Sequence, residues 1–203
     1  MKTKLLIFFT LIGLGSYQLT AQEKYTNASG DGDGLWGTLA NWENTVGGAP
    51  STSLPTSTDR ATLKSTTGIN LGGITRTVGS LYFNQNSNTT ASNGTLVLDG
   101  SSDDFIISNW TSKRSQLICD VTVNVTGKSF KNRGAANSKL RFLTGTVALG
   151  TNLVYIDNYK LEFPIEFDGI VTGATTSEIN IINSNNGGID LGTTSDFSGF
   201  TGS

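Results

Sequence analysis

From Ala61 onward, the chain is a series of short apolar or alternating runs, each of strand length and each bounded by Gly, Asn, Asp or Ser. Examples are residues 79–83 (GSLYF), 94–98 (GTLVL) and 116–125 (QLICDVTVNV). Runs of this length between turn-forming residues predict β-strands. No window carries helical periodicity over three turns, so we expect an all-β fold.

The composition narrows the chemistry that the chain can perform. The 203 residues carry a formal net charge of −2, are 36% hydrophobic, and include one Cys and no His. Such a chain can bury the core of a single domain, and its acidic balance disfavours nucleic acid as a partner. Catalysis by Ser-His-Asp or Cys-His sets and by His-bound zinc is excluded. The lone Cys119 cannot form an internal disulfide, and its apolar surroundings indicate a small buried side chain.

The first 21 residues have the organisation of a secretory signal peptide. Lys2 and Lys4 precede an apolar stretch over residues 5–14, and a more polar stretch follows with the small Ala21 near its end. The apolar stretch is about half of the ~20 residues that a membrane-spanning helix needs. We therefore expect cleavage after Ala21, a secreted or cell-surface protein, and no transmembrane segment once the signal is removed.

Alternation in residues 160–168 assigns side chains to two faces of a strand. The odd positions are Leu161, Phe163, Ile165 and Phe167, whereas the even positions are polar or Pro. One-sided strands occur in antiparallel β-sandwiches and in β-solenoids, whose rungs of roughly 20 to 25 residues stack on one another. Corners of variable length and a distinct amino-terminal segment favour the solenoid, and the β-sandwich is the alternative.

Residues 22–60 differ from the rest and predict a cap over the open end of the solenoid. They contain Trp36 and Trp42, two of the three prolines, and the sequence GDGDG at residues 30–34. Residues 61–203 then form the rungs.

Several stretches resemble bacterial secreted, autotransporter-like right-handed β-helix proteins. They are GLWGTLANWENTVGGAP (34–50), PTSTDRATL (55–63) and TVGSLYF (77–83), and SDFSGFTG (195–202) is similar to the rung motif of autotransporter-associated β-strand repeats. The signal ending in TAQ resembles those of exported Bacteroidetes proteins. The resemblance implies a parallel right-handed β-helix with a Trp-containing cap. Because rungs in that family continue past this length, we expect residues 61–203 to be truncated at the carboxy end.

Carboxylates on the polar face of residues 160–168 are the strongest candidates for acid/base catalysis. At ~3.3 Å per residue, Glu166 and Asp168 would lie about 6.6 Å apart, at the short end of the separation used by inverting glycosidases. Glu162 would lie about 13 Å from Glu166, too far to form a pair, and is a candidate for ligand binding. The competing interpretation is a solvated strand face.

Three further sets of residues are weaker candidates. Asp31 and Asp33 could offer carboxylates to Ca²⁺, although a flexible turn explains them equally simply. Trp36 and Trp42 could stack on sugar rings, or they could cap the first rung as buried aromatics. Lys131 and Arg133 are similar to the basic sets of β-helix polysaccharide lyases, but a solvated loop also accounts for them.

These observations favour an exported, non-enzymatic, adhesin-like β-solenoid that presents a strand face to glycans or cell-surface proteins and needs no cofactor. A polysaccharide-active β-helix enzyme, either a lyase or an inverting hydrolase, is one alternative. A carbohydrate-binding module is the other.

Overall fold

A computed structural model describes residues 22–26, 33–64, 68–84, 89–100, 103–110, 113–134, 138–158, 165–182, 189–192 and 194–203. The predicted signal peptide lies outside these residues. The described part is built from β-strands and one short 3-10 helix, η1 (Leu39–Asn41). It contains no α-helix, in agreement with the all-β prediction.

The first sheet has eight strands in the order β16-β13-β10-β8-β6-β3-β1-β2. Every neighbouring pair is parallel except β1 and β2, which are antiparallel. The strands are β1 (Glu23–Thr26), β2 (Trp42–Glu43), β3 (Arg60–Leu63), β6 (Ser80–Phe83), β8 (Phe105–Asn109), β10 (Lys128–Asn132), β13 (Leu153–Asn158) and β16 (Glu178–Ile182).

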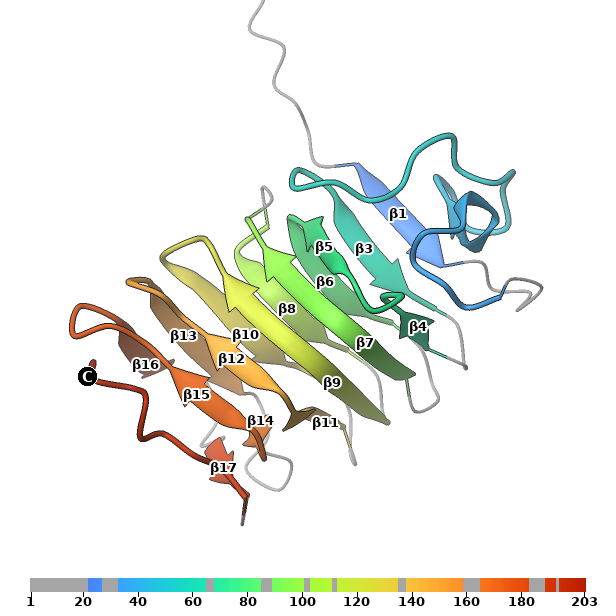
Figure 1. Ribbon diagram of the computed structural model, residues 1–203. Coiled ribbons are helices and arrows are strands. Elements are labelled where there is room, and N and C mark those ends of the chain that lie inside the picture. Colours follow the sequence, from blue (N-terminus) through green and yellow to red (C-terminus); the bar gives the residue numbers. More distant parts are fainter. Residues whose placement is uncertain are drawn as a thin grey trace, which may run out of the picture.

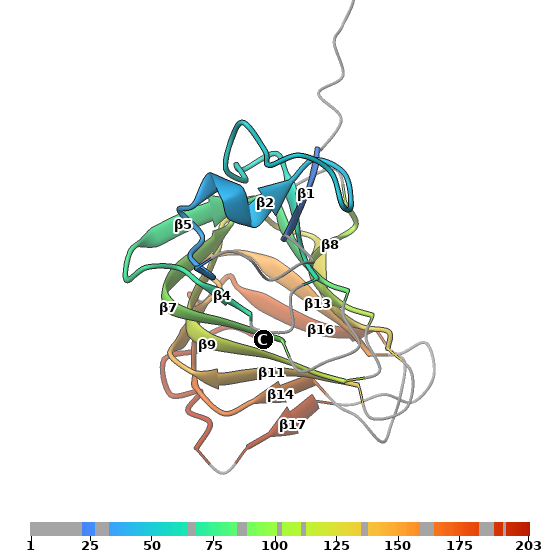
Figure 2. The ribbon, with the colours of Figure 1, turned by 90° about the vertical axis from the view of Figure 1, so that its right-hand side faces the viewer.

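The second sheet lies on the other side of the core, and all its pairs are parallel. The strands of the second sheet are β4 (Ile69–Asn70), β5 (Thr75–Val78), β7 (Thr89–Leu98), β9 (Arg114–Val123), β11 (Lys139–Thr144), β12 (Thr146–Ala148), β14 (Ile165–Phe167), β15 (Ile170–Thr172) and β17 (Ile189–Leu191). Figure 2 shows β7, β9, β11, β14 and β17 along one side of the molecule, and β8, β13 and β16 along another.

The chain alternates between the two sheets and returns to each one a rung later (Figure 1). From β3 onward Arg60 pairs with Ser80 and Phe130 pairs with Ile156, so successive rungs are 20 to 26 residues apart. The step from β1 to β3 is longer, because Glu23 pairs with Arg60. This is the architecture of a parallel β-solenoid, and it confirms the predicted fold. Parallel pairing excludes the alternative β-sandwich, which is built from antiparallel sheets.

The core is formed by inward-facing side chains that stack from rung to rung. Phe142 and Phe167 are register partners whose rings stack 4.7 Å apart at an interplanar angle of 5°. Phe130 reaches them from the first sheet, with its ring centre 5.1 Å from that of Phe142. Ile165 and Phe167 are buried, as their alternation predicts, and Cys119 is buried as a free thiol.

A polar ladder runs through the buried side of the first sheet. Asn109, Asn132 and Asn158 occupy matching positions in β8, β10 and β13, and each is at most 1% exposed. The Asn109 side-chain amide donates to Asn132 Oδ1 at 3.1 Å, and that of Asn132 donates to Asn158 Oδ1 at 3.4 Å. Because buried amides require partners, the ladder fixes the register of three rungs.

The amino-terminal segment closes one end of the stack. Trp36 and Trp42 are 1% and 0% exposed, and their rings meet edge to face at 4.8 Å. The indole N–H of Trp42 donates to the Trp36 carbonyl oxygen at 2.8 Å. Strand β1 already belongs to the first sheet, so the parallel stack begins at Glu23, within the segment predicted as the cap. Figure 1 places this cap at the opposite end of the stack from the C end of the chain.

Candidate functional site

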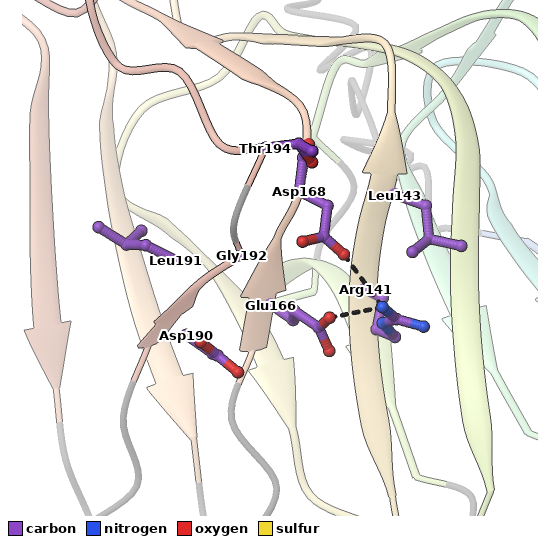
Figure 3. A pocket seen from close by; sticks show the side chains of 8 residues that line it. All are labelled: Arg141, Leu143, Glu166, Asp168, Asp190, Leu191, Gly192 and Thr194. Carbon is purple, nitrogen blue, oxygen red and sulfur yellow. Dashed lines mark hydrogen bonds and ion pairs between the residues drawn. The ribbon is translucent and has the colours of Figure 1, made fainter.

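A polar pocket lies on the outer face of the second sheet, where β11, β14 and β17 run side by side (Figure 3). Parallel register stacks Arg141 on Glu166 and Glu166 on Asp190. Neighbouring strands are ~4.8 Å apart, so these side chains project from one surface as a continuous row. The cavity has a volume of about 500 Å³. Its lining is completed by Leu143, Asp168, Leu191, Gly192 and Thr194.

Arg141 binds two carboxylates through one guanidinium nitrogen. Its Nη2 lies 2.5 Å from Glu166 Oε1 and 3.0 Å from Asp168 Oδ2. Lys139 adds a contact of 3.5 Å between its Nζ and Glu166 Oε2. Glu166 is 7% exposed, so the interaction is shielded from solvent more than most surface ion pairs are.

The pKa values of the two carboxyl groups are displaced in opposite directions. Burial acts to raise the pKa of Glu166, but hydrogen bonds with Arg141 and Asp168 and two nearby cations bring it below its ordinary value. For Asp168, burial together with the hydrogen bond and the negative charge of Glu166 raises the pKa above its ordinary value, although Arg141 opposes this. The pair therefore retains a proton more readily at Asp168 than at Glu166.

This geometry corrects the predicted separation of Glu166 and Asp168. Glu166 Oε1 and Asp168 Oδ2 contact the same nitrogen, Arg141 Nη2, at 2.5 Å and 3.0 Å, so these two oxygens are at most about 5.5 Å apart instead of about 6.6 Å. An inverting hydrolase needs space for a water molecule between its carboxyl groups. Here the Arg141 guanidinium group binds both carboxylates in place of such a water molecule.

Asp190 is the member of the row that stays available. It is exposed, and among the described residues its carboxylate has no ion-pair or hydrogen-bond partner. Thr194 lies beside Asp168, and its hydroxyl donates to the Asp168 carbonyl oxygen at 2.6 Å (Figure 3). The pocket thus combines a fixed charged floor with a free carboxylate at its edge.

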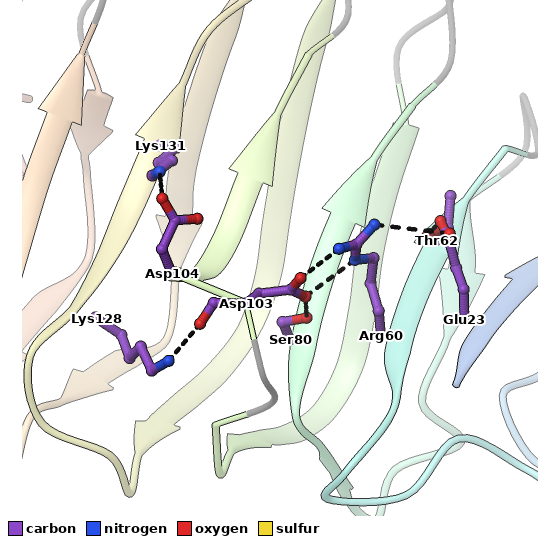
Figure 4. Close-up of polar contacts among 8 residues, drawn as sticks. All are labelled: Glu23, Arg60, Thr62, Ser80, Asp103, Asp104, Lys128 and Lys131. Carbon is purple, nitrogen blue, oxygen red and sulfur yellow. Dashed lines mark hydrogen bonds and ion pairs between the residues drawn. The ribbon is translucent and has the colours of Figure 1, made fainter. Parts of the chain in front are cut away.

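Lys131 and Arg133 lie on the other sheet and are not part of this pocket. Lys131 Nζ is 2.5 Å from Asp104 Oδ2 (Figure 4) and 3.9 Å from Asp157 Oδ2. Arg133 Nη2 is 2.5 Å from that same Asp157 oxygen. No partner acid was identifiable near them in sequence, but stacking of the rungs supplies two. A lyase base must be free to take a proton, and both of these cations are engaged by carboxylates.

The outer face of the first sheet continues as a network of paired charges. Arg60 binds Asp103 through two nitrogens, with Nε 2.9 Å from Oδ2, and Ser80 donates to the same oxygen at 2.6 Å (Figure 4). Arg60 also lies 3.6 Å from Glu23. These contacts join residues of different rungs. They pair the charged groups of Glu23, Arg60 and Asp103 within the protein.

The remaining predicted site residues have local roles or lie outside the described part. Trp36 and Trp42 are buried, so neither ring has a free face for a sugar, which corrects their assignment as ligand-binding residues. Asp33 accepts hydrogen bonds from the Leu35 backbone N–H, Thr38 and Asn41, and the first of these contributes most to lowering its pKa. Asp31 and Glu162 lie outside the described residues.

The part of the chain that the structure describes contains no candidate cluster for metal binding. Within it, no group of three or more His, Cys, Asp or Glu side chains is arranged to hold an ion. The three carboxylates that line the pocket do not meet this geometry, because Arg141 lies between two of them as a shared partner.

Sequence reasoning missed Arg141 and Asp190, the partners that turn Glu166 into part of a row. The signal was present in the spacing, because residues 141, 166 and 190 recur at the rung repeat. This spacing does not identify the row unless the register is known, that is, which residues of neighbouring strands pair with one another. A strict repeat would have supplied that register, and the chain does not have one.

Two further observations bear on identity. No helix in the described ranges has the length and apolar character needed to cross a bilayer. Comparisons with protein-family models, curated proteins and solved structures found no match to this chain.

Proposed function

We propose that the protein is an exported, non-enzymatic β-solenoid that presents an outer strand face to glycans on or near the cell surface. The observation that carries the proposal is the pocket built from Arg141, Glu166 and Asp190 at the rung repeat. Carboxylates and guanidinium groups form strong hydrogen bonds, and in this pocket they are arranged in a row on a rigid sheet. Such a row suits a ligand that carries many hydroxyl groups along an extended chain.

The charge of the pocket indicates which glycans to test first. Three carboxylates and one guanidinium group line the pocket, and Asp190 is unpaired among the described residues. Hydroxyl groups can donate to these oxygens, whereas a uronate would bring a like charge to them. Neutral glycans are therefore the expected ligands, and acidic ones should bind less well.

Binding can be measured with the purified exported protein on an array of neutral and acidic glycans, followed by calorimetry on those retained. We expect Asp190→Asn to weaken binding of a neutral glycan by about 5- to 50-fold, since one charge-assisted hydrogen bond becomes a neutral one. Asp99→Asn is the matched control, because Asp99 is also exposed and lies outside the pocket. Retention of no glycan, or equal affinity in both variants, would contradict the proposal.

The non-enzymatic part has its own test. Incubation of each retained polysaccharide with the protein should leave its chain length unchanged over a day, as judged by size-exclusion chromatography. Shortened products that disappear in a Glu166→Gln variant would instead support the hydrolase alternative.

Export rests on the predicted signal peptide. We expect the native protein to begin after Ala21 and to be found outside the cell or on its surface. Amino-terminal sequencing of the native protein and protease accessibility of whole cells check both points. An amino terminus that retains residues 1–21, with the protein kept inside the cell, would overturn this part of the proposal.

A further inference from the structure

Lys24 is a buried lysine without a carboxylate partner. It lies on the inner side of β1, in register with the core residue Ala61, and is 1% exposed. Its Nζ contacts three neutral oxygens, at 2.6 Å from Asn44 Oδ1, 2.9 Å from Ser51 Oγ and 3.2 Å from Ser53 Oγ. Among the described residues no acid pairs with it. Buried lysines are rare unless they are paired, so this arrangement needs an explanation.

The strand pairing brings the lysine and the asparagine together. Strands β1 and β2 are antiparallel, with Tyr25 opposite Glu43 and Thr26 opposite Trp42. Continuing this register by one residue places Asn44 opposite Lys24. Because a C=O bond is about 1.23 Å long, the contact at Asn44 Oδ1 puts the amide carbon within about 3.8 Å of the amine. That distance is close to the ~3 to 3.5 Å of a near-attack geometry.

Ser51 is placed to assist a reaction between them. Its side chain is buried, with the residue 3% exposed. Its Oγ lies 2.9 Å from Lys24 Nζ, and its hydroxyl can donate either to Asn44 Oδ1 at 3.0 Å or to the Ser53 carbonyl oxygen at 2.7 Å. A hydroxyl in this position can take a proton from the amine and can also stabilise negative charge that develops on the amide oxygen. No carboxylate belongs to this set of described residues.

We propose that Lys24 and Asn44 form an intramolecular isopeptide bond. Nζ attacks the amide carbon Cγ, the Nζ–Cγ bond forms, and the Cγ–Nδ2 bond breaks. One proton passes from the amine to the departing nitrogen by way of Ser51 Oγ, and ammonia leaves. The step exchanges one amide for another, so it consumes no oxidant, reductant or other reactant.

The bond would close the capped end of the solenoid covalently. It would join β1 to the residue that follows β2, and among the described strands of the first sheet these two form the one antiparallel pair. The chain has a single Cys, so a disulfide within the protein cannot do this. The proposal is independent of glycan binding, because Lys24 and Asn44 lie in the cap and take no part in the pocket.

Mass spectrometry of the 203-residue chain, expressed and exported, tests the proposal directly. We expect an intact mass about 17 Da below that of residues 22–203, which is the mass of one ammonia molecule. Peptide mapping should find a branched peptide that joins Lys24 to Asn44, with no tryptic cleavage after Lys24. A full-length mass and an ordinary linear peptide that contains unmodified Lys24 would overturn the proposal.

Two lysine variants and one serine variant identify which residues take part in the reaction. Lys24→Arg should restore the full mass, whereas Lys64→Arg should keep the deficit, because the Lys64 ammonium lies over the Tyr25 ring instead of in this cluster. A deficit that persists in Lys24→Arg would place the loss of ammonia elsewhere and refute the bond. Ser51→Ala should lower the crosslinked fraction at least tenfold, and unchanged crosslinking would remove its assigned role. If Lys24→Arg does not fold, the peptide map of the native protein decides.

Discussion

At the scale of single residues, Glu166 and Asp168 place two negative charges on one guanidinium group. The raised pKa of Asp168 means that the folded protein holds this proton more tightly than the unfolded chain does. Its contribution to stability is therefore present at low pH and is lost as the pH rises through the raised value. Glu166 behaves in the opposite way, because its lowered pKa gives stability that is lost as the pH falls through the folded-state value.

We predict that Asp168→Asn stabilises the protein at neutral pH. The amide removes the like charge beside Glu166, and the gain should be at most about 1 kcal/mol because the pair lies near the surface. Urea unfolding at about pH 7 and about pH 3 checks this, since a carboxyl group whose pKa is raised carries its proton at a pH below the ordinary value for Asp. Asp99→Asn should change stability little at either pH. A gain of equal size at both pH values would contradict the explanation.

Asn132 is the central member of the asparagine ladder, and we predict that Asn132→Ala destabilises the protein by about 2 to 4 kcal/mol. The change removes the acceptor of Asn109 and the donors to Asn158 Oδ1 and to the Ser138 carbonyl oxygen. The control is Asn124→Ala at an exposed position, with an expected loss below about 0.5 kcal/mol. Equal losses for the two variants in chemical denaturation would show that the ladder contributes nothing specific.

The sequence predicts which side chains of a strand are buried, but it does not predict which residues of neighbouring rungs contact them. Ile165 and Phe167 are inside because the strand alternates, and both are predicted there. Glu166 was predicted on the outer face and is there, yet it is buried by Arg141 from the preceding rung. Burial of that kind depends on inter-rung contacts, which a single strand does not encode.

At the scale of elements, the corners between strands restrict which residues the sequence can carry, because some of them require glycine. Gly145 turns the chain from β11 to β12 with φ = 86°, and a Cβ there would lie 2.8 Å from the backbone carbonyl of Cys119. Gly127 has a similar φ of 72°, but a Cβ there would meet nothing within 4 Å. Comparing substitutions at the two glycines therefore distinguishes the cost of backbone strain from the cost of steric contact.

We predict that Gly145→Ala lowers the free energy of unfolding by about 2 to 4 kcal/mol, and that Gly127→Ala lowers it by about 1 kcal/mol. The difference comes from the contact with the preceding rung, which must move for the methyl group to fit. Urea midpoints of the two variants measure it. Equal losses of unfolding free energy in the two variants would mean that the neighbouring rung moves to admit the methyl group at no cost in free energy.

The same elements show where sequence reasoning succeeded and where it stopped. Strand-length runs and turn residues predicted the strands and the solenoid, because alternation and Gly-rich corners are local properties. The cap boundary was placed at residue 60, whereas β1 already pairs with β3 in parallel. Its four residues are too few to reveal an alternating pattern, and their membership of the sheet is set by the partner strand.

At the scale of the whole molecule, the two ends of the stack differ. Trp36, Trp42 and β2 cover the first rung, whereas at the other end the inward-facing Ile181 and Leu191 are 55% and 57% exposed. Within the described residues β17 has one partner strand, and β16 has one together with the backbone of Ser203. In stacked repeats each rung is stabilised mainly by its neighbours, so a rung with one neighbour should open most often.

Hydrogen exchange followed by mass spectrometry should therefore show a gradient along the stack. We predict the slowest exchange in β8 and β10, which have neighbours on both sides, slower exchange in β1 and β3 than in β16, and the fastest in β17. Trp42→Ala should accelerate exchange in β1 and β3 by at least tenfold while leaving β16 unchanged, because it opens only the capped end. Exchange in β16 and β17 as slow as that in β10 would contradict the gradient, since it would mean that the exposed isoleucine and leucine side chains are covered in solution.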